Sequence, residues 1–114
     1  MRFELDTLED GAVRVRLEGR LDAQGAQEIE VPLTAATAQV KRLIVDLGDV
    51  PYIASIGIRL LFTLARTASR RGGKVVLTNP SPTVSAALLS TGVDKVIAMT
   101  SSLEEARALL PAEA

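Results

Sequence analysis

The sequence contains neither cysteine nor histidine, and both absences exclude classes of chemistry. Without cysteine, a disulfide framework and a thiolate nucleophile are impossible. Without histidine, the chain has no Ser-His-Asp or Cys-His catalysis, no imidazole base and no histidine-based metal site. We therefore expect that the protein holds no metal and no cofactor.

Aromatic residues and long apolar runs are also scarce, which limits the partners and the compartment. One tyrosine, two phenylalanines and no tryptophan leave few side chains to stack on bases, and the formal net charge is only −1, so nucleic-acid binding is not expected. No segment approaches the roughly 18 apolar residues of a membrane span, and the N-terminus lacks the apolar core of a signal peptide. We expect a cytoplasmic protein without membrane insertion. The densest basic group is interpreted as a solvated helix face and its exit: Arg66, Arg70, Arg71 and Lys74.

The 114 residues, 47% of them apolar, suit one domain with an aliphatic core. We expect this domain over residues 1–110 and a flexible tail over residues 111–114. Apolar and charged residues alternate over residues 3–5 and 13–17, and residues 9–11 between them have turn composition. This pattern predicts a hairpin with one solvated face.

Helix and strand patterns alternate through the rest of the chain. We expect strands over residues 43–47, 74–78 and 95–99, and helices near residues 23–39, 55–71, 82–91 and from residue 103. The first helix is expected to bend or split, because it contains Pro32 and an interior proline costs roughly 3 kcal/mol. The second should bury a stripe of Ile58, Leu61, Phe62, Ala65 and Ala68. The order predicts an α/β fold with a mixed, mostly parallel sheet, an N-terminal hairpin and about four helices.

Three segments carry the motifs of a known family. Gly19-Arg20-Leu21-Asp22 follows the hairpin, the run 43–53 reads LIVDLGDVPYI, and Ala54-Ser55-Ile56-Gly57-Ile58 comes directly after it. In this order and spacing, they resemble the STAS domain of bacterial anti-sigma factor antagonists over essentially the whole chain. The resemblance implies that Ser55 is the phosphorylated serine. Ala54 stands where the family has an aspartate, and Ile56 where it has a second small polar residue.

The resemblance also implies a function and a set of partners. The unphosphorylated form would bind an anti-sigma factor that is also a serine kinase, and so release a sigma factor; phosphorylation of Ser55 would switch this binding off. The protein itself would not be an enzyme. A PP2C-like phosphatase would be a further partner, and the protein would be a monomer or a weak homodimer. The alternative is an adaptor subunit of a larger assembly, either a stressosome or a phospholipid-transport ABC complex.

The docking surface is expected around Ser55, because loops that follow parallel strands gather at the carboxyl edge of the sheet. Its predicted members are Arg20, Leu21, Asp22, Pro51, Tyr52, Ala54, Ser55, Ile56, Gly57 and Arg59. A phosphate on Ser55 would meet the unpaired N–H groups and partial positive charge of a helix N-terminus. A simpler role for Ser55 is that of a helix N-cap, worth ~1 kcal/mol, and the two roles are compatible.

The chain also offers three carboxylates near strand ends, Asp22, Asp46 and Asp49, which could serve a small α/β enzyme. We favour structural roles for them. Asp22 is placed to cap a helix, Asp46 to accept hydrogen bonds from loop N–H groups, and Asp49 lies in turn sequence. No glycine-rich phosphate loop accompanies them.

Overall fold

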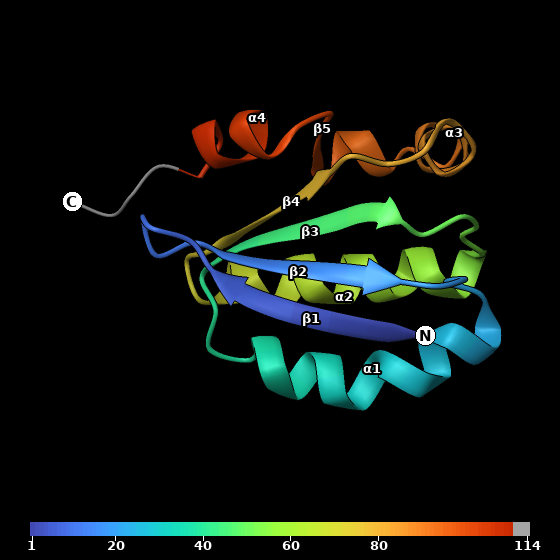
Figure 1. The fold of residues 1–114 in the computed structure, drawn as a ribbon, viewed down its shortest axis with the longest axis horizontal. Coiled ribbons are helices and arrows are strands. Elements are labelled where there is room, and N and C mark those ends of the chain that lie inside the picture. The colour runs from blue at the N-terminus through green and yellow to red at the C-terminus, as the bar shows by residue number, and fades with distance from the viewer. Residues whose placement is uncertain (111–114) are drawn as a thin grey trace.

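The computed structural model describes residues 1–110, so the predicted tail lies outside the described residues. Five strands form one sheet in the order β1-β2-β3-β4-β5 (Figure 1). They are β1 (Arg2–Thr7), β2 (Val13–Glu18), β3 (Arg42–Asp49), β4 (Lys74–Thr78) and β5 (Ala98–Thr100). β1 is antiparallel to β2 and every later pair is parallel, as the sequence predicts.

Helices cover both faces of this sheet. They are α1 (Ala23–Thr37), α2 (Ser55–Arg70), α3 (Pro82–Ser90) and α4 (Leu103–Ala108), with a short 3₁₀ helix, η1 (Val93–Lys95). Buried side chains of α1, α2 and α3 share one core cluster with β2, β3 and β4, whereas α4 packs on the other face against Ile44 and Val76. The predicted α/β architecture with an N-terminal hairpin is therefore confirmed.

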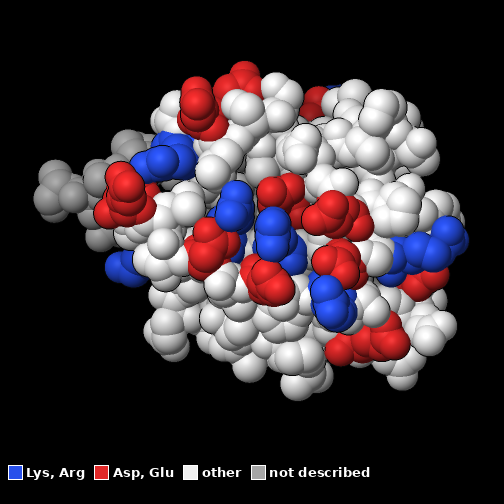
Figure 2. All heavy atoms as spheres, in the orientation of Figure 1, with Lys and Arg blue, Asp and Glu red and all other residues white. Residues whose placement is uncertain are grey.

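The hairpin has the predicted solvated face. Gly11 turns the chain with φ at +88°, and the Asp10 carboxylate accepts the Ala12 N–H at 3.1 Å. Arg14 pairs with Asp6 at 3.1 Å and Arg16 with Glu4 at 2.9 Å, each across the two strands. Figure 2 shows the resulting mixture of positive and negative side chains over β1 and β2. Cross-strand pairs of opposite charge are favourable in this arrangement.

The sequence predicts that the first helix bends or splits, and the structure excludes the split. α1 is one continuous helix that contains Pro32 in its interior (Figure 1). Pro32 itself is exposed, but Ile29 and Leu33 beside it are fully buried in the core. Burying each such side chain stabilises the fold by roughly 1.5–3 kcal/mol, which offsets the roughly 3 kcal/mol cost of the proline. The core contacts therefore decide the outcome against local propensity.

The last strand is shorter than predicted and begins later. Gly92, with φ at +76°, starts the 3₁₀ turn η1, and the N–H groups of Val96 and Ile97 both donate to the Val93 carbonyl. These bonds keep residues 93–97 out of the sheet ladder, so β5 is limited to three residues. Val96 is left 69% exposed, although its sequence context favours a strand.

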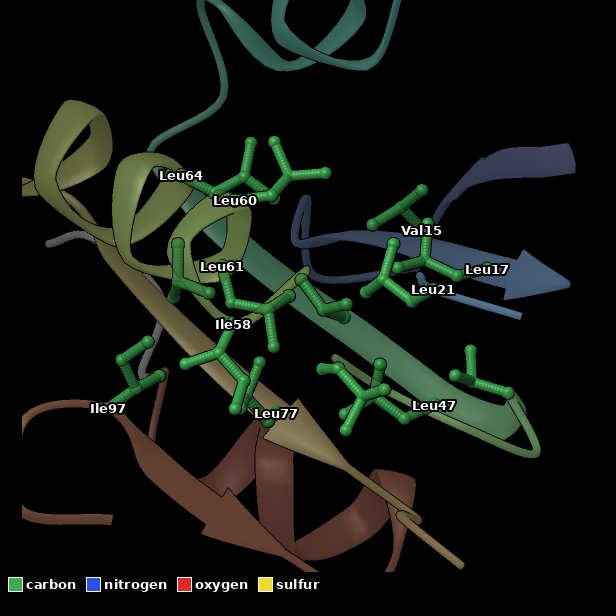
Figure 3. Close-up of a cluster of buried hydrophobic side chains, with 14 of the residues drawn as sticks. Val15, Leu17, Leu21, Leu47, Ile58, Leu60, Leu61, Leu64, Leu77 and Ile97 are labelled. Carbon is green, nitrogen blue, oxygen red and sulfur yellow. The ribbon is translucent and has the colours of Figure 1, made fainter. Parts of the chain in front are cut away.

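The buried face of α2 is rotated from the predicted stripe. Ile58, Leu61 and Ala68 are buried as predicted, but Phe62 and Ala65 are only half-buried. Leu60 and Leu64 are buried instead, and α1 packs on α2. Figure 3 shows Ile58 and Leu61 directed from α2 toward Leu77 of β4. The consequence is that one flank of α2, with Phe62 and Ala65, remains partly open beside its N-terminus.

Candidate functional site

Two loops meet at the carboxyl edge of the sheet, immediately before α1 and α2. The Gly19 N–H donates to the Asp49 carbonyl at 3.1 Å, and the Leu21 N–H donates to the Tyr52 carbonyl at 2.9 Å. The carbonyl oxygen of Leu21 accepts a hydrogen bond from the Ala54 N–H at 3.0 Å. Leu21 also forms an isolated parallel β-bridge with Ile53. These bonds join the loop after β2 to the loop after β3, so the two segments expected to be neighbours lie side by side.

Gly57 lets α2 approach this pair of loops closely. A Cβ atom at residue 57 would lie 2.5 Å from the Leu21 carbonyl oxygen and 2.6 Å from its Cγ, closer than real Cβ atoms come. The side chain of Leu21 is itself fully buried. Leu21 and Gly57, both predicted as docking residues, therefore support the surface from beneath and expose no side chain on it.

Ser55 is the first residue of α2, and its position corrects the N-cap interpretation. The cap position belongs to Ala54, whose extended backbone (φ −106°, ψ 171°) precedes the helix and whose methyl side chain provides no acceptor. The Ser55 side chain is exposed, and within residues 1–110 it takes part in no hydrogen bond. A free hydroxyl thus stands at a helix end whose first N–H groups have no side-chain cap.

Arg20, Asp22 and Tyr52 form a linked group beside Ser55. The Arg20 guanidinium lies 4.4 Å from the centre of the Tyr52 ring, a cation–π geometry, and its Nε is 3.3 Å from an Asp22 carboxylate oxygen. The other Asp22 oxygen accepts the Gly25 N–H at 2.9 Å and so caps α1. The pKa of Asp22 is lowered, chiefly by that backbone hydrogen bond and further by Arg20. The predicted capping role of Asp22 is confirmed.

The exposed part of the predicted surface is apolar at its centre and charged at its rim. Tyr52 and Ile56 are each 40% exposed. Pro51 and Arg59 are also exposed, and Ala54 is half-buried. The structure therefore brings every predicted docking residue to one edge, with the two buried members below it.

An apolar groove extends from Ser55 along α2 and was missed in the sequence. Its volume is about 730 Å³, and its floor includes the half-buried Phe62 and Ala65. The lining residues are Ser55, Ile58, Arg59, Phe62, Ala65, Arg66, Ser69, Arg70 and Val96. Positions 59, 62, 66, 69 and 70 recur at three- and four-residue intervals, so this stripe could have been recognised as one face of a helix. The contribution of Val96 to this groove could not have been recognised, because Val96 was expected inside a strand.

The aspartates expected to have structural roles are not gathered into one site. Asp46 accepts the Gly48 N–H at 2.9 Å, but this N–H lies within β3 and not in a loop as predicted, and Asp49 ends β3 instead of lying in a turn. Within residues 1–110, no group of three or more aspartate, glutamate, histidine or cysteine side chains is arranged to hold a metal ion. No helix in the same part of the chain has both the length and the apolar character needed to span a membrane.

The fold and this edge define an α/β domain that presents a serine-centred surface at the start of its second helix. The family model of the STAS domain matches residues 6–106. The chain therefore belongs to the STAS domain family.

Several similar proteins are known by name. The chain is 31% identical to an anti-sigma F factor antagonist of Lysinibacillus sphaericus over 74% of each protein. It is 28% identical to BtrV of Bordetella bronchiseptica, a candidate anti-sigma factor antagonist, over 95% of this chain and 93% of that protein. Among solved structures, the unphosphorylated anti-sigma factor antagonist SpoIIAA superposes with a TM-score of 0.77 and 27% identity over 95% of both chains. Phosphorylated SpoIIAA of Bacillus superposes with a TM-score of 0.69 and 26% identity, over 95% of this chain and 98% of the other.

Proposed function

We propose that this protein is a cytoplasmic anti-sigma factor antagonist. Its unphosphorylated form binds an anti-sigma factor that is also a serine kinase, and this binding frees a sigma factor. Phosphorylation of Ser55 by the same kinase ends the interaction, and a PP2C-like phosphatase restores it. The protein itself catalyses no reaction. The observation that carries the proposal is the exposed Ser55 hydroxyl without a hydrogen bond, at the first position of α2 and beside the exposed Tyr52 and Ile56.

The geometry suits phosphoryl transfer to this hydroxyl. The Ser55 oxygen would attack the γ-phosphorus of ATP, the bond from that phosphorus to the bridging oxygen of the β-phosphate would break, and ADP would leave. The hydroxyl proton would pass to a base on the kinase. Because Ala54 supplies no cap, the phosphate would give the first N–H groups of α2 the acceptor that they lack, in the favourable field of the helix N-terminus.

The same phosphate would oppose docking. It adds about −1.5 to −2 charges to a surface whose centre is apolar. A partner that covers Tyr52 and Ile56 would have to desolvate this charge, and burying an unmatched charge commonly costs several kcal/mol. Phosphorylation should therefore weaken the complex at least tenfold, for which about 1.4 kcal/mol is enough.

The site assignment is tested by incubating the protein with its cognate kinase and ATP and mapping phosphate by mass spectrometry. We expect phosphate on Ser55, and a folded Ser55→Ala variant that still binds the kinase but accepts none. Phosphate on Thr63 or Ser69 with none on Ser55 would refute the assignment. If the kinase phosphorylates no residue at all, the adaptor function is the better account.

The sign of the switch and the surface are tested by calorimetry with the same kinase. The protein phosphorylated on Ser55 should bind at least tenfold more weakly than the unmodified protein, while its melting temperature stays level or rises. Among unmodified variants, Arg59→Glu should weaken binding much more than Lys41→Glu, because Lys41 is exposed beside a different hollow, with Asp10 and Gln39. Equal losses for the two charge reversals would contradict the proposed surface.

A further inference from the structure

Ser55 and Arg59 lie one helical turn apart on α2 and line the same groove. Side chains four residues apart on a helix are neighbours, with Cβ atoms about 6 Å from each other. Both side chains are exposed, so neither is held away from the other by the core. A phosphate on the Ser55 oxygen would extend the first side chain toward the second.

Arg59 is available for such a contact. Within residues 1–110, the N-terminal amine and six arginines pair with carboxylates, and Arg59 is not among them: it lies within 4.0 Å of no carboxylate oxygen in this part of the chain. The charged residues that share its surroundings are few. Arg66 and Arg70 line the groove farther along α2, and Glu30 of α1 lines a small hollow on the other flank of Arg59.

We infer that Arg59 receives the phosphate of phosphorylated Ser55 in an i,i+4 ion pair along α2. This inference deepens the proposed function, on which it rests, because it states what phosphorylation changes at the docking edge. In the unmodified protein, Arg59 is a free cation at the mouth of an apolar groove and can meet a carboxylate of the partner. In the phosphorylated protein, the same guanidinium is paired with the phosphate on Ser55 and is no longer available to the partner.

Phosphorylation then acts twice on the partner. It adds negative charge at residue 55, and it withdraws the positive charge that residue 59 would offer. Guanidinium groups bind phosphate oxygens with two parallel hydrogen bonds, so arginine suits this exchange better than lysine does. Arg66 and Arg70, two and three turns beyond Arg59, are too far along the helix to take its place.

The pair is tested without any partner, on protein into which phosphoserine is incorporated at residue 55 during synthesis. Phosphorus NMR follows the second ionisation of the phosphate, and the Nε–H signal of Arg59 is recorded over the same titration. A nearby cation stabilises the dianion, so Arg59→Gln should raise the phosphate pKa by about 0.3 unit, the size expected of an exposed i,i+4 pair. Arg59→Lys should restore part of this shift, and 1 M salt should largely abolish it.

The matched control is Arg66→Gln, which removes an equal charge from the same groove. We expect this change to leave the phosphate pKa within about 0.1 unit of the parent, because about three turns of helix separate residue 66 from the phosphate on residue 55. The inference is overturned if Arg59→Gln shifts the pKa no more than Arg66→Gln does, or if only Arg20→Gln shifts it. An Arg59 signal that does not follow the phosphate titration would also contradict the pair.

The outcomes separate this inference from the proposed function. A phosphate pKa that depends on Arg59, together with phosphorylated protein that still binds the kinase tightly, would retain the ion pair and refute the off-switch. Weak binding of the phosphorylated protein, with no effect of Arg59 on the phosphate, would retain the switch and refute the ion pair.

Discussion

Replacing Gly57 with alanine places a methyl group where the structure has no room for it. The new Cβ would lie 2.5 Å from the carbonyl oxygen of Leu21, 2.6 Å from its Cγ and 3.1 Å from Cγ1 of Ile53. Overpacking of this kind typically costs about 1–3 kcal/mol. The Leu21 carbonyl also accepts the Ala54 N–H, so moving it aside endangers a hydrogen bond worth about 1 kcal/mol.

The gain in helix propensity opposes these costs. Alanine is more favourable than glycine inside a helix by about 1 kcal/mol, so the expected net loss of stability is about 1–3 kcal/mol. Urea unfolding measures this loss directly, and the melting temperature should fall by at least about 4 °C. Backbone NMR shifts should change most at Leu21, Ile53 and Ala54. An alanine variant as stable as the parent would refute the close packing of α2 on the two loops.

Three further changes test the starts of α1 and α2. Ser55→Ala should change the free energy of unfolding by less than about 0.5 kcal/mol in urea titrations, because the hydroxyl caps nothing; a loss of about 1 kcal/mol would restore the N-cap interpretation. Ala54→Asp should stabilise the protein by about 1 kcal/mol in the same assay, since it supplies the missing cap, and an unchanged midpoint would argue against an uncapped α2. Asp22→Ala should destabilise the protein near neutral pH. The pKa of Asp22 is lowered by folding, chiefly by the Gly25 N–H, so its contribution is present above the unfolded-state pKa of about 3.9 and is lost as the pH falls through the folded-state value. The parent and the Asp22→Ala variant should therefore converge in acid, and a gap that persists below about pH 2 would contradict this linkage.

Most of the fold could be predicted because its signals are local. Alternation around Gly11 and the apolar run of β3 depend on a few neighbouring residues, and both elements form as expected. The errors arise where distant contacts decide. Pro32 stays inside one helix because Ile29 and Leu33 are buried against the sheet. Residues 95–97 are withheld from β5 by backbone hydrogen bonds to the carbonyls of Gly92 and Val93, which their β-prone composition does not reveal.

The location of the candidate site could be predicted from the sequence, but its capping residue and its groove could not. Strand order places the loops after β2 and β3 together, and this much follows from topology. Which residue caps α2 depends on backbone angles, and these assign the position to Ala54 instead of Ser55. The groove depends on the rotation of α2 against α1, which leaves Phe62 half-buried and Leu64 buried. The periodicity of apolar residues defines a stripe along a helix, but it does not show which neighbouring element packs on each side of that stripe.

The two outer strands of the sheet also affect how the protein behaves at high concentration. In the described part of the chain, β1 has a strand on one side only, and its open edge has alternating charged side chains, Arg2, Glu4 and Asp6. At the opposite edge, β5 offers only three residues. Charged or very short edge strands are poor templates for a strand from another molecule, so the sheet resists growth by edge-to-edge aggregation at both ends. Contacts between molecules are thereby directed away from exposed backbone and toward side-chain surfaces.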